Sequence, residues 1–186
     1  MVVSRLGGSS LSSLSTSLSC IALTDGDVQA VHLLAQNLQN PFNEISSRLA
    51  KAHLLLWGDD PSSHPGNTNF DDWCRREWNT AWEEGESVQF DILLAGDVLY
   101  KEELPKLFFE TVQRYMAWNP PGVLWLCHVP RASVSHEVVV AASQKAGFEI
   151  ELRWKYEDDS DSFRVEGSPM EDLKRARVYK ITAAPA

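Results

Sequence analysis

The sequence predicts an α/β fold in which a mostly parallel β-sheet carries helices on both faces. Strand-like and helix-like segments alternate from Cys20 onward, a pattern typical of βαβ units. The apolar run at 90–96 ends abruptly in Gly96 and Asp97, as expected for a central strand buried on both faces. Near the C-terminus an acidic loop, and no clear helix, joins two strand-like segments. These two segments predict an antiparallel strand pair at the C-terminal edge of the sheet.

The expected elements follow from periodicity and from turn and capping residues. We expect strands at 20–25, 51–56, 88–96, 123–129, 148–155 and 177–182, and helices at 27–39, 70–84, 102–117 and 133–146. Asp25 or Asp27 can cap the first helix, which ends at Asn40 and Pro41. Gly147 suits the C-terminal cap of the last helix.

Composition predicts one domain and excludes several classes of protein. The chain has 186 residues, of which 44% are hydrophobic and 23% are charged, an ordinary balance for a soluble domain. A formal charge of −9 argues against a broadly basic nucleic-acid surface, so we expect no nucleic-acid partner. No apolar run reaches the roughly 18–20 residues that span a bilayer. We therefore expect neither nucleic acid nor membrane as a partner, and the sequence does not indicate an oligomeric state.

The first 19 residues differ from the rest of the chain. They are rich in serine, contain Arg5 and lack an acidic residue. Such a start resembles an organellar targeting segment, and a degenerate or truncated first strand is the alternative. We divide the chain into this segment, 1–19, and a domain at 20–186. The three separated cysteines have no metal-ligand spacing, so we expect no metal site and a reducing intracellular compartment, cytoplasmic or nuclear.

Acidic residues at strand ends are the candidate functional residues. Ligands of parallel sheets bind beyond the carboxyl ends of strands, where Asp25, Asp27 and Asp97 are expected to lie. Each has a structural alternative: Asp27 can be a helix N-cap, and Asp97 can cap the helix that begins near residue 102. Trp57 can belong to the core, and Tyr100 can pack on the next helix. The tryptophans within 70–84 are expected to serve packing.

Three motifs resemble a known family. They are LTDGD at 23–27, LWGD at 56–59 and LAGDVLY at 94–100. Their order and spacing resemble the Rossmann-like, seven-stranded class I S-adenosylmethionine-dependent methyltransferases. Within this class they are most similar to the protein-lysine methyltransferases of methyltransferase family 16. The resemblance implies S-adenosylmethionine as cofactor and a lysine-bearing protein as substrate.

The resemblance also implies residue roles. Asp25 or Asp27 would bind the ribose hydroxyls, and Trp57 would lie against the adenine, with Gly58 giving the backbone room to approach. Asp97 would lie at the methionine end of the cofactor or at the mouth of the lysine channel, and Tyr100 would line that channel. We therefore expect Asp27, Trp57 and Asp97 to converge around one crevice.

The chain departs from the family at its N-terminal end. The glycine-rich loop that follows the family's first strand is missing, and the corresponding residues 4–11 read SRLGGSSL. Glycines are needed in such a loop because the chain turns tightly and approaches the ligand closely. A non-catalytic, methyltransferase-like binding domain is therefore the alternative function. A dinucleotide-binding oxidoreductase would need a GxGxxG loop, which the sequence lacks.

Overall fold

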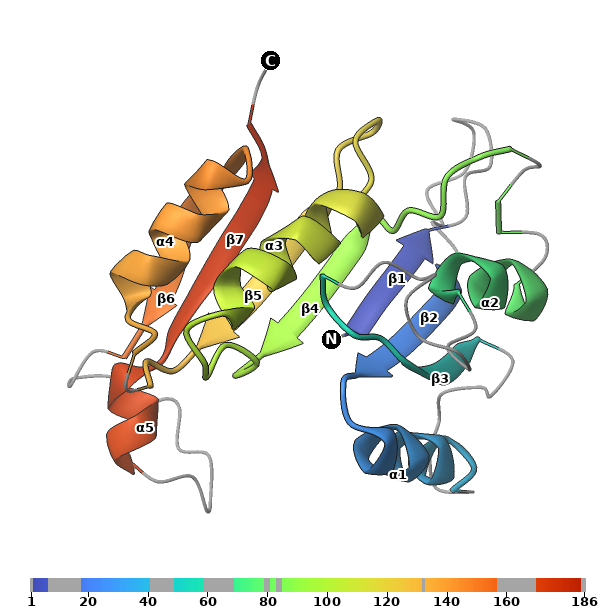
Figure 1. The fold of residues 1–186 in the computed structure, drawn as a ribbon, viewed down its shortest axis with the longest axis horizontal. Helices are drawn as coiled ribbons and strands as arrows, with labels where there is room; N and C mark the ends of the chain where they lie inside the picture. Colours follow the sequence, from blue (N-terminus) through green and yellow to red (C-terminus); the bar gives the residue numbers. More distant parts are fainter. Residues whose placement is uncertain are drawn as a thin grey trace.

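A seven-stranded sheet with helices packed against it forms the molecule (Figure 1). The structure is a computed structural model and describes residues 2–6, 18–40, 49–58, 69–78, 81–82, 85–131, 133–156 and 170–184. The strands are β1 Val2–Leu6, β2 Leu18–Asp25, β3 Ala50–Leu54, β4 Ile92–Gly96, β5 Val123–His128, β6 Phe148–Lys155 and β7 Arg177–Ala183. The helices are α1 Val28–Leu38, α2 Phe70–Glu77, α3 Leu104–Tyr115, α4 His136–Lys145 and α5 Met170–Arg175.

The strand order is β3-β2-β1-β4-β5-β7-β6. Strands β2 and β3 pair in parallel, as do β4 and β5, whereas β7 is antiparallel to both β5 and β6. Five of the seven strands share one direction, and β1 and β7 run against them. The structure therefore confirms the mostly parallel, Rossmann-like sheet with an antiparallel pair at the C-terminal edge.

The two parallel crossover connections run in opposite directions across the sheet. The chain moves from β2 to β3 in one direction across the sheet and from β4 to β5 in the other. Because parallel crossovers are right-handed, these directions predict α1 and α3 on opposite faces. Helix α4 lies beside α3 on the same face (Figure 1). The point between β2 and β4, where the direction reverses, is where ligands of such sheets bind.

Strand β1 occupies the centre of the sheet but runs antiparallel to both neighbours. Val2 is paired with Leu23 of β2 and Leu94 of β4, both near the carboxyl ends of their strands. Leu6 is paired with Leu18 at the opposite edge, and the arrow of β1 points against those of β2 and β4 in Figure 1. Strand β1 therefore runs toward the edge away from the strand-end acids. Residues 7–11 of the segment that was compared with the family's cofactor loop lie outside the described residues.

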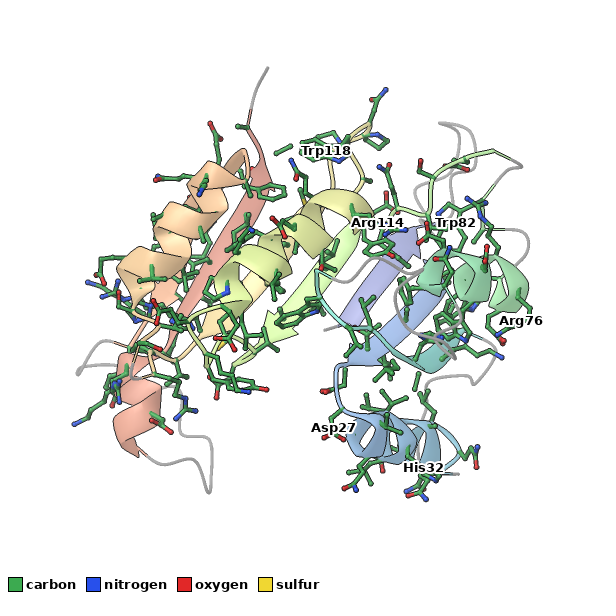
Figure 2. All side chains as sticks on the ribbon, viewed as in Figure 1. Asp27, His32, Arg76, Trp82, Arg114 and Trp118 are labelled. Atoms are coloured by element: carbon green, nitrogen blue, oxygen red, sulfur yellow. The ribbon has the colours of Figure 1, made fainter. Side chains whose placement is uncertain are left out.

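Two helices differ most from the sequence prediction. Helix α2 ends at Glu77, not at residue 84, and Trp78 and Trp82 are buried beyond its end. Figure 2 shows Trp82 in this region. Helix α5 was not predicted, and the acidic loop at 157–161 lies outside the described residues. The packing role of Trp73, Trp78 and Trp82 is confirmed, since each is only 6% exposed.

The two faces of the central strands differ in burial. On the α3 side, Leu93 and Leu124 are fully buried beneath the helices. On the other side, Leu94 and its cross-strand neighbour Trp125 are 45% and 36% exposed. Such alternation is unusual for central strands of a doubly covered sheet, which usually bury both faces. The continuous apolar run at 90–96 therefore correctly predicted a strand but overestimated the burial of its second face.

Candidate functional site

An open hollow lies on the exposed face of β4, β5 and β7 and reaches the end of β2. Its volume is about 420 Å³. Its lining residues are Asp25, Leu94, Ala95, Gly96, Val98, Trp125, Cys127 and Val178. Asp25 is the last residue of β2 and Gly96 is the last residue of β4, so strand ends from both sides of β1 border one space. An added Cβ at Gly96 would meet no atom within 4 Å, so the end of β4 is open at this position.

The acids after β2 form a compact turn into α1. The Oδ1 atom of Asp25 accepts a hydrogen bond from the backbone N–H of Asp27 at 2.9 Å. The Oδ1 atom of Asp27 accepts bonds from the N–H groups of Gln29 and Ala30 at 2.6 and 3.1 Å. Asp27 is therefore the N-cap of α1, at whose start Figure 2 shows it. The Oδ2 atoms take no part in these three bonds, so capping remains compatible with ligand binding.

The residues after β3 are packed against α3. The ring of Trp57 meets that of Phe108 edge to face, with ring centroids 4.9 Å apart. Gly58 has a φ of +76°, and a Cβ there would lie 2.3 Å from Cδ2 of Leu107. Both residues therefore have a packing role in addition to the predicted adenine contact. Asp59, the last residue of this motif, lies outside the described residues.

Asp97 lies directly after β4 in a left-handed backbone conformation, with a φ of 48°. Its N–H donates to the carbonyl of Cys127 at 2.9 Å, and its Oδ2 lies 2.5 Å from Nη2 of Arg131. The alternative that Asp97 caps the next helix is wrong, because α3 begins at Leu104 after Glu103. Tyr100, three residues further on, is 57% exposed, and its role as a channel residue stays a prediction.

The structure brings the predicted residues to one edge of the sheet but does not place all of them at one cavity. Asp27, Trp57 and Asp97 follow β2, β3 and β4, whose carboxyl ends share that edge. Among the described residues, Asp25 lines the cavity together with the two chain neighbours of Asp97. Asp27 and Trp57 are not among the lining residues. The role of each in cofactor binding stays a prediction.

Sequence reasoning missed Arg131 and Asp172. Arg131 follows β5 and contacts Asp97, and its Nη1 also lies 3.3 Å from Oδ2 of Asp172 in α5. The hydrogen bond with Asp97 and the negative charge of that carboxylate raise the pKa of Arg131 above its ordinary value. The position of Arg131 just beyond a strand was an available signal. No local pattern in the sequence indicated Asp172.

A pair of histidines lies behind these residues. His128, the last residue of β5, is fully buried, and burial lowers its pKa to about 4. Its ring meets that of His136 edge to face at 5.1 Å. His136 donates from Nε2 to the carbonyl of Arg175 at 3.0 Å and accepts at Nδ1 from the hydroxyl of Tyr179 at 3.2 Å. Burial lowers the pKa of His136 as well, so both rings are neutral near pH 7.

Cys127, which lines the cavity, does not have the properties of an activated nucleophile. Burial and the nearby charge of Asp97 raise the pKa of Cys127, so its thiol stays protonated and is a poor nucleophile.

Within the described residues, no group of histidine, cysteine and acidic side chains has the arrangement of a metal site. In the same part of the chain, no helix is both long and apolar enough to cross a bilayer.

Comparison with known proteins gives likenesses of fold. No family model matches the chain, and no curated protein matches it. One similar solved structure is the precorrin-6y C5,15-methyltransferase of Geobacter metallireducens GS-15, with a TM-score of 0.45 and 13% identity over 89% of this chain and 66% of that chain. A second, provisionally assigned as a methyltransferase of Thermoplasma acidophilum, has a TM-score of 0.41 and 10% identity over 89% of this chain and 57% of that chain. The chain thus spans less than two thirds of either neighbour, and the likeness concerns the fold alone.

Proposed function

We propose that this chain binds S-adenosylmethionine at the carboxyl ends of β2, β3 and β4 and transfers its methyl group to a lysine side chain of a protein. The observation that carries this proposal is the hollow on the exposed face of β4, β5 and β7, which reaches Asp25 and Gly96 at the ends of β2 and β4. The carboxyl ends of these strands are where sheets of this kind hold nucleotide-like ligands. The lysine acceptor rests on the resemblance of the three sequence motifs.

The residues present fit the adenosyl group in several respects. A volume of about 420 Å³ lies within the roughly 300–1,000 Å³ of small-molecule sites. Carboxylates at the end of β2 are suited to accept hydrogen bonds from ribose hydroxyls. Gly96 leaves open space where a side chain would otherwise project. The half-buried Trp57 offers a flat aromatic surface near the same edge, which suits an adenine base.

S-adenosylmethionine, held at the carboxyl ends of β2, β3 and β4, would supply a methyl group on a positively charged sulfur, and the sulfur would keep the electron pair when the lysine nitrogen takes the methyl group. The lysine must first lose a proton to solvent or to a base. Tyr100 and neighbouring apolar groups would help by desolvating the ammonium, which lowers its pKa. Asp97 would orient the incoming nitrogen at the strand end, so the protein contributes mainly alignment.

A non-catalytic binding domain is the second candidate, and the direction of β1 favours it. In a parallel sheet, the loop after the first strand reaches the ligand from the carboxyl edge. Here the carboxyl end of β1 lies at the opposite edge. This direction of β1 supports the reading of a binding domain that has lost the family's glycine-rich cofactor loop.

Titration calorimetry with S-adenosylmethionine tests cofactor binding directly. We expect saturable heat with the wild-type chain and its loss in Gly96→Leu, because the new side chain would occupy the cavity. Lys101→Leu, outside the cavity lining, is the matched control and should bind as the wild type does. Absence of heat from the wild type at millimolar cofactor would refute the enzyme reading and leave the non-catalytic domain. Binding without transfer of a radiolabelled methyl group to a lysine-peptide library would favour the binding domain.

A further inference from the structure

Arg131 joins two segments that are far apart in the sequence. Its guanidinium lies 2.5 Å from Oδ2 of Asp97, directly after β4, and 3.3 Å from Oδ2 of Asp172, in α5. Two nitrogens of one planar group make these contacts, a geometry that fixes directions better than a single ammonium does. The side chains of Arg131, Asp97 and Asp172 are 38%, 41% and 35% exposed, so they lie at the surface.

The backbone that carries Arg131 is itself held in place. Its N–H donates to the carbonyl of Val134 at 3.2 Å, and its carbonyl accepts from the N–H of Val134 at 2.7 Å. The adjacent carbonyl of Pro130 accepts a bond from Nη2 of Arg175 at 2.6 Å. Nε2 of His136 donates to the backbone carbonyl of Arg175. The loop after β5 and the end of α5 thus make reciprocal contacts, and Arg131 extends from a defined base.

Asp97 needs such support. A φ of 48° is uncommon for a residue other than glycine, although aspartate tolerates it better than most. Conformations of this kind persist where surrounding contacts impose them, and they gather at functional sites. Here the contacts are the bond from its N–H to Cys127 and the ion pair with Arg131. Of these two, only the ion pair directs the carboxylate.

We infer that Arg131 is a positioning residue: it directs the carboxylate of Asp97 at the mouth of the site and docks α5 beside it. One guanidinium therefore contacts both Asp97, directly after β4, and α5, and it adds to the contacts that Arg175 makes at the end of this helix. This inference rests on the proposed function for its catalytic meaning, whereas the coupling between Asp97 and α5 stands on the contacts alone.

Hydrogen exchange measured by mass spectrometry tests the coupling without any activity assay. Arg131→Gln should raise amide exchange about fivefold or more in both 97–101 and 170–175, because it removes both ion pairs. Asp172→Asn should raise exchange in 170–175 only. The matched control is Arg114→Gln, which removes a similarly exposed pair, Arg114 with Asp71 at 3.2 Å, between α3 and α2. It should leave both segments unchanged; Figure 2 shows Arg114 away from α5.

The kinetic arm separates positioning from a purely structural role. In an active chain, Arg131→Gln should lower kcat by about tenfold or more with little change in the KM for cofactor, because alignment and not binding is lost. Arg131→Lys should restore part of kcat, and the Tm of both variants should stay near that of Arg114→Gln. Unchanged exchange at 97–101 in Arg131→Gln, or an equal effect of Arg114→Gln, would overturn the inference. If the wild type transfers no methyl group, the proposed function fails, and the exchange data alone decide the role of Arg131.

Discussion

Replacing Gly58 with alanine measures how much the turn after β3 depends on its packing against α3. The backbone φ of +76° is unfavourable for alanine by about 1–2 kcal/mol. The new Cβ would also lie 2.3 Å from Cδ2 and 3.3 Å from Cβ of Leu107, so α3 or its side chain has to move. Overpacking of this kind costs about 1–3 kcal/mol. We therefore expect Gly58→Ala to lower the free energy of unfolding by about 2–5 kcal/mol.

Gly147→Ala is the matched control, because its φ is +80° and an added Cβ would meet no atom within 4 Å. It should lose only the conformational contribution, about 1–2 kcal/mol. Urea unfolding followed by circular dichroism gives both values, and the difference between the variants isolates the contact with Leu107. Leu107→Ala should be less damaging in the Gly58→Ala background than in the wild type, because it creates the space that the new methyl group needs.

Equal losses in the two glycine variants would refute the packing argument. S-adenosylmethionine calorimetry on Gly58→Ala then tests the other role predicted for this residue, close approach of the backbone to the adenine. A variant that keeps its stability but binds the cofactor more weakly would assign Gly58 to the ligand and not to α3.

Three further predictions concern stability and surface. Asp27→Ala should destabilise the chain by about 1 kcal/mol in thermal unfolding, whereas Asp27→Asn should retain the N-cap and most of the stability. Between pH 6.5 and about 4, His128 binds a proton when unfolded but not when folded, so stability should fall with decreasing pH by up to about 3 kcal/mol. His128→Leu should flatten this dependence in urea titrations at several pH values, and an unchanged slope would contradict the assignment. Leu94→Ser should reduce binding of the dye ANS with little change in Tm, because Leu94 is already 45% exposed; the equally accessible Val138→Ser on α4 is the control.

Local patterns in the sequence were sufficient for most of the elements. Strand β6 has the predicted bounds, and α1 and α3 differ from prediction by one or two residues at each end. Apolar spacing and capping act over a few residues, so they can be read directly: Asp27 was predicted as a cap and is one. Helix α5 is only six residues long and carries too little periodicity to be recognised.

The sequence by itself determined the alternating α/β order, the antiparallel C-terminal pair and the acids that follow β2 and β4, because each depends on neighbouring residues. Only the tertiary structure decided the direction of β1. The sequence of a five-residue strand does not indicate its orientation in a sheet, because backbone hydrogen bonds to β2 and β4 set that orientation. Only the tertiary structure placed Arg131 between Asp97 and Asp172, residues 34 and 41 positions away. Contacts over such separations arise from the folding of the whole sheet and have no signature within any single segment.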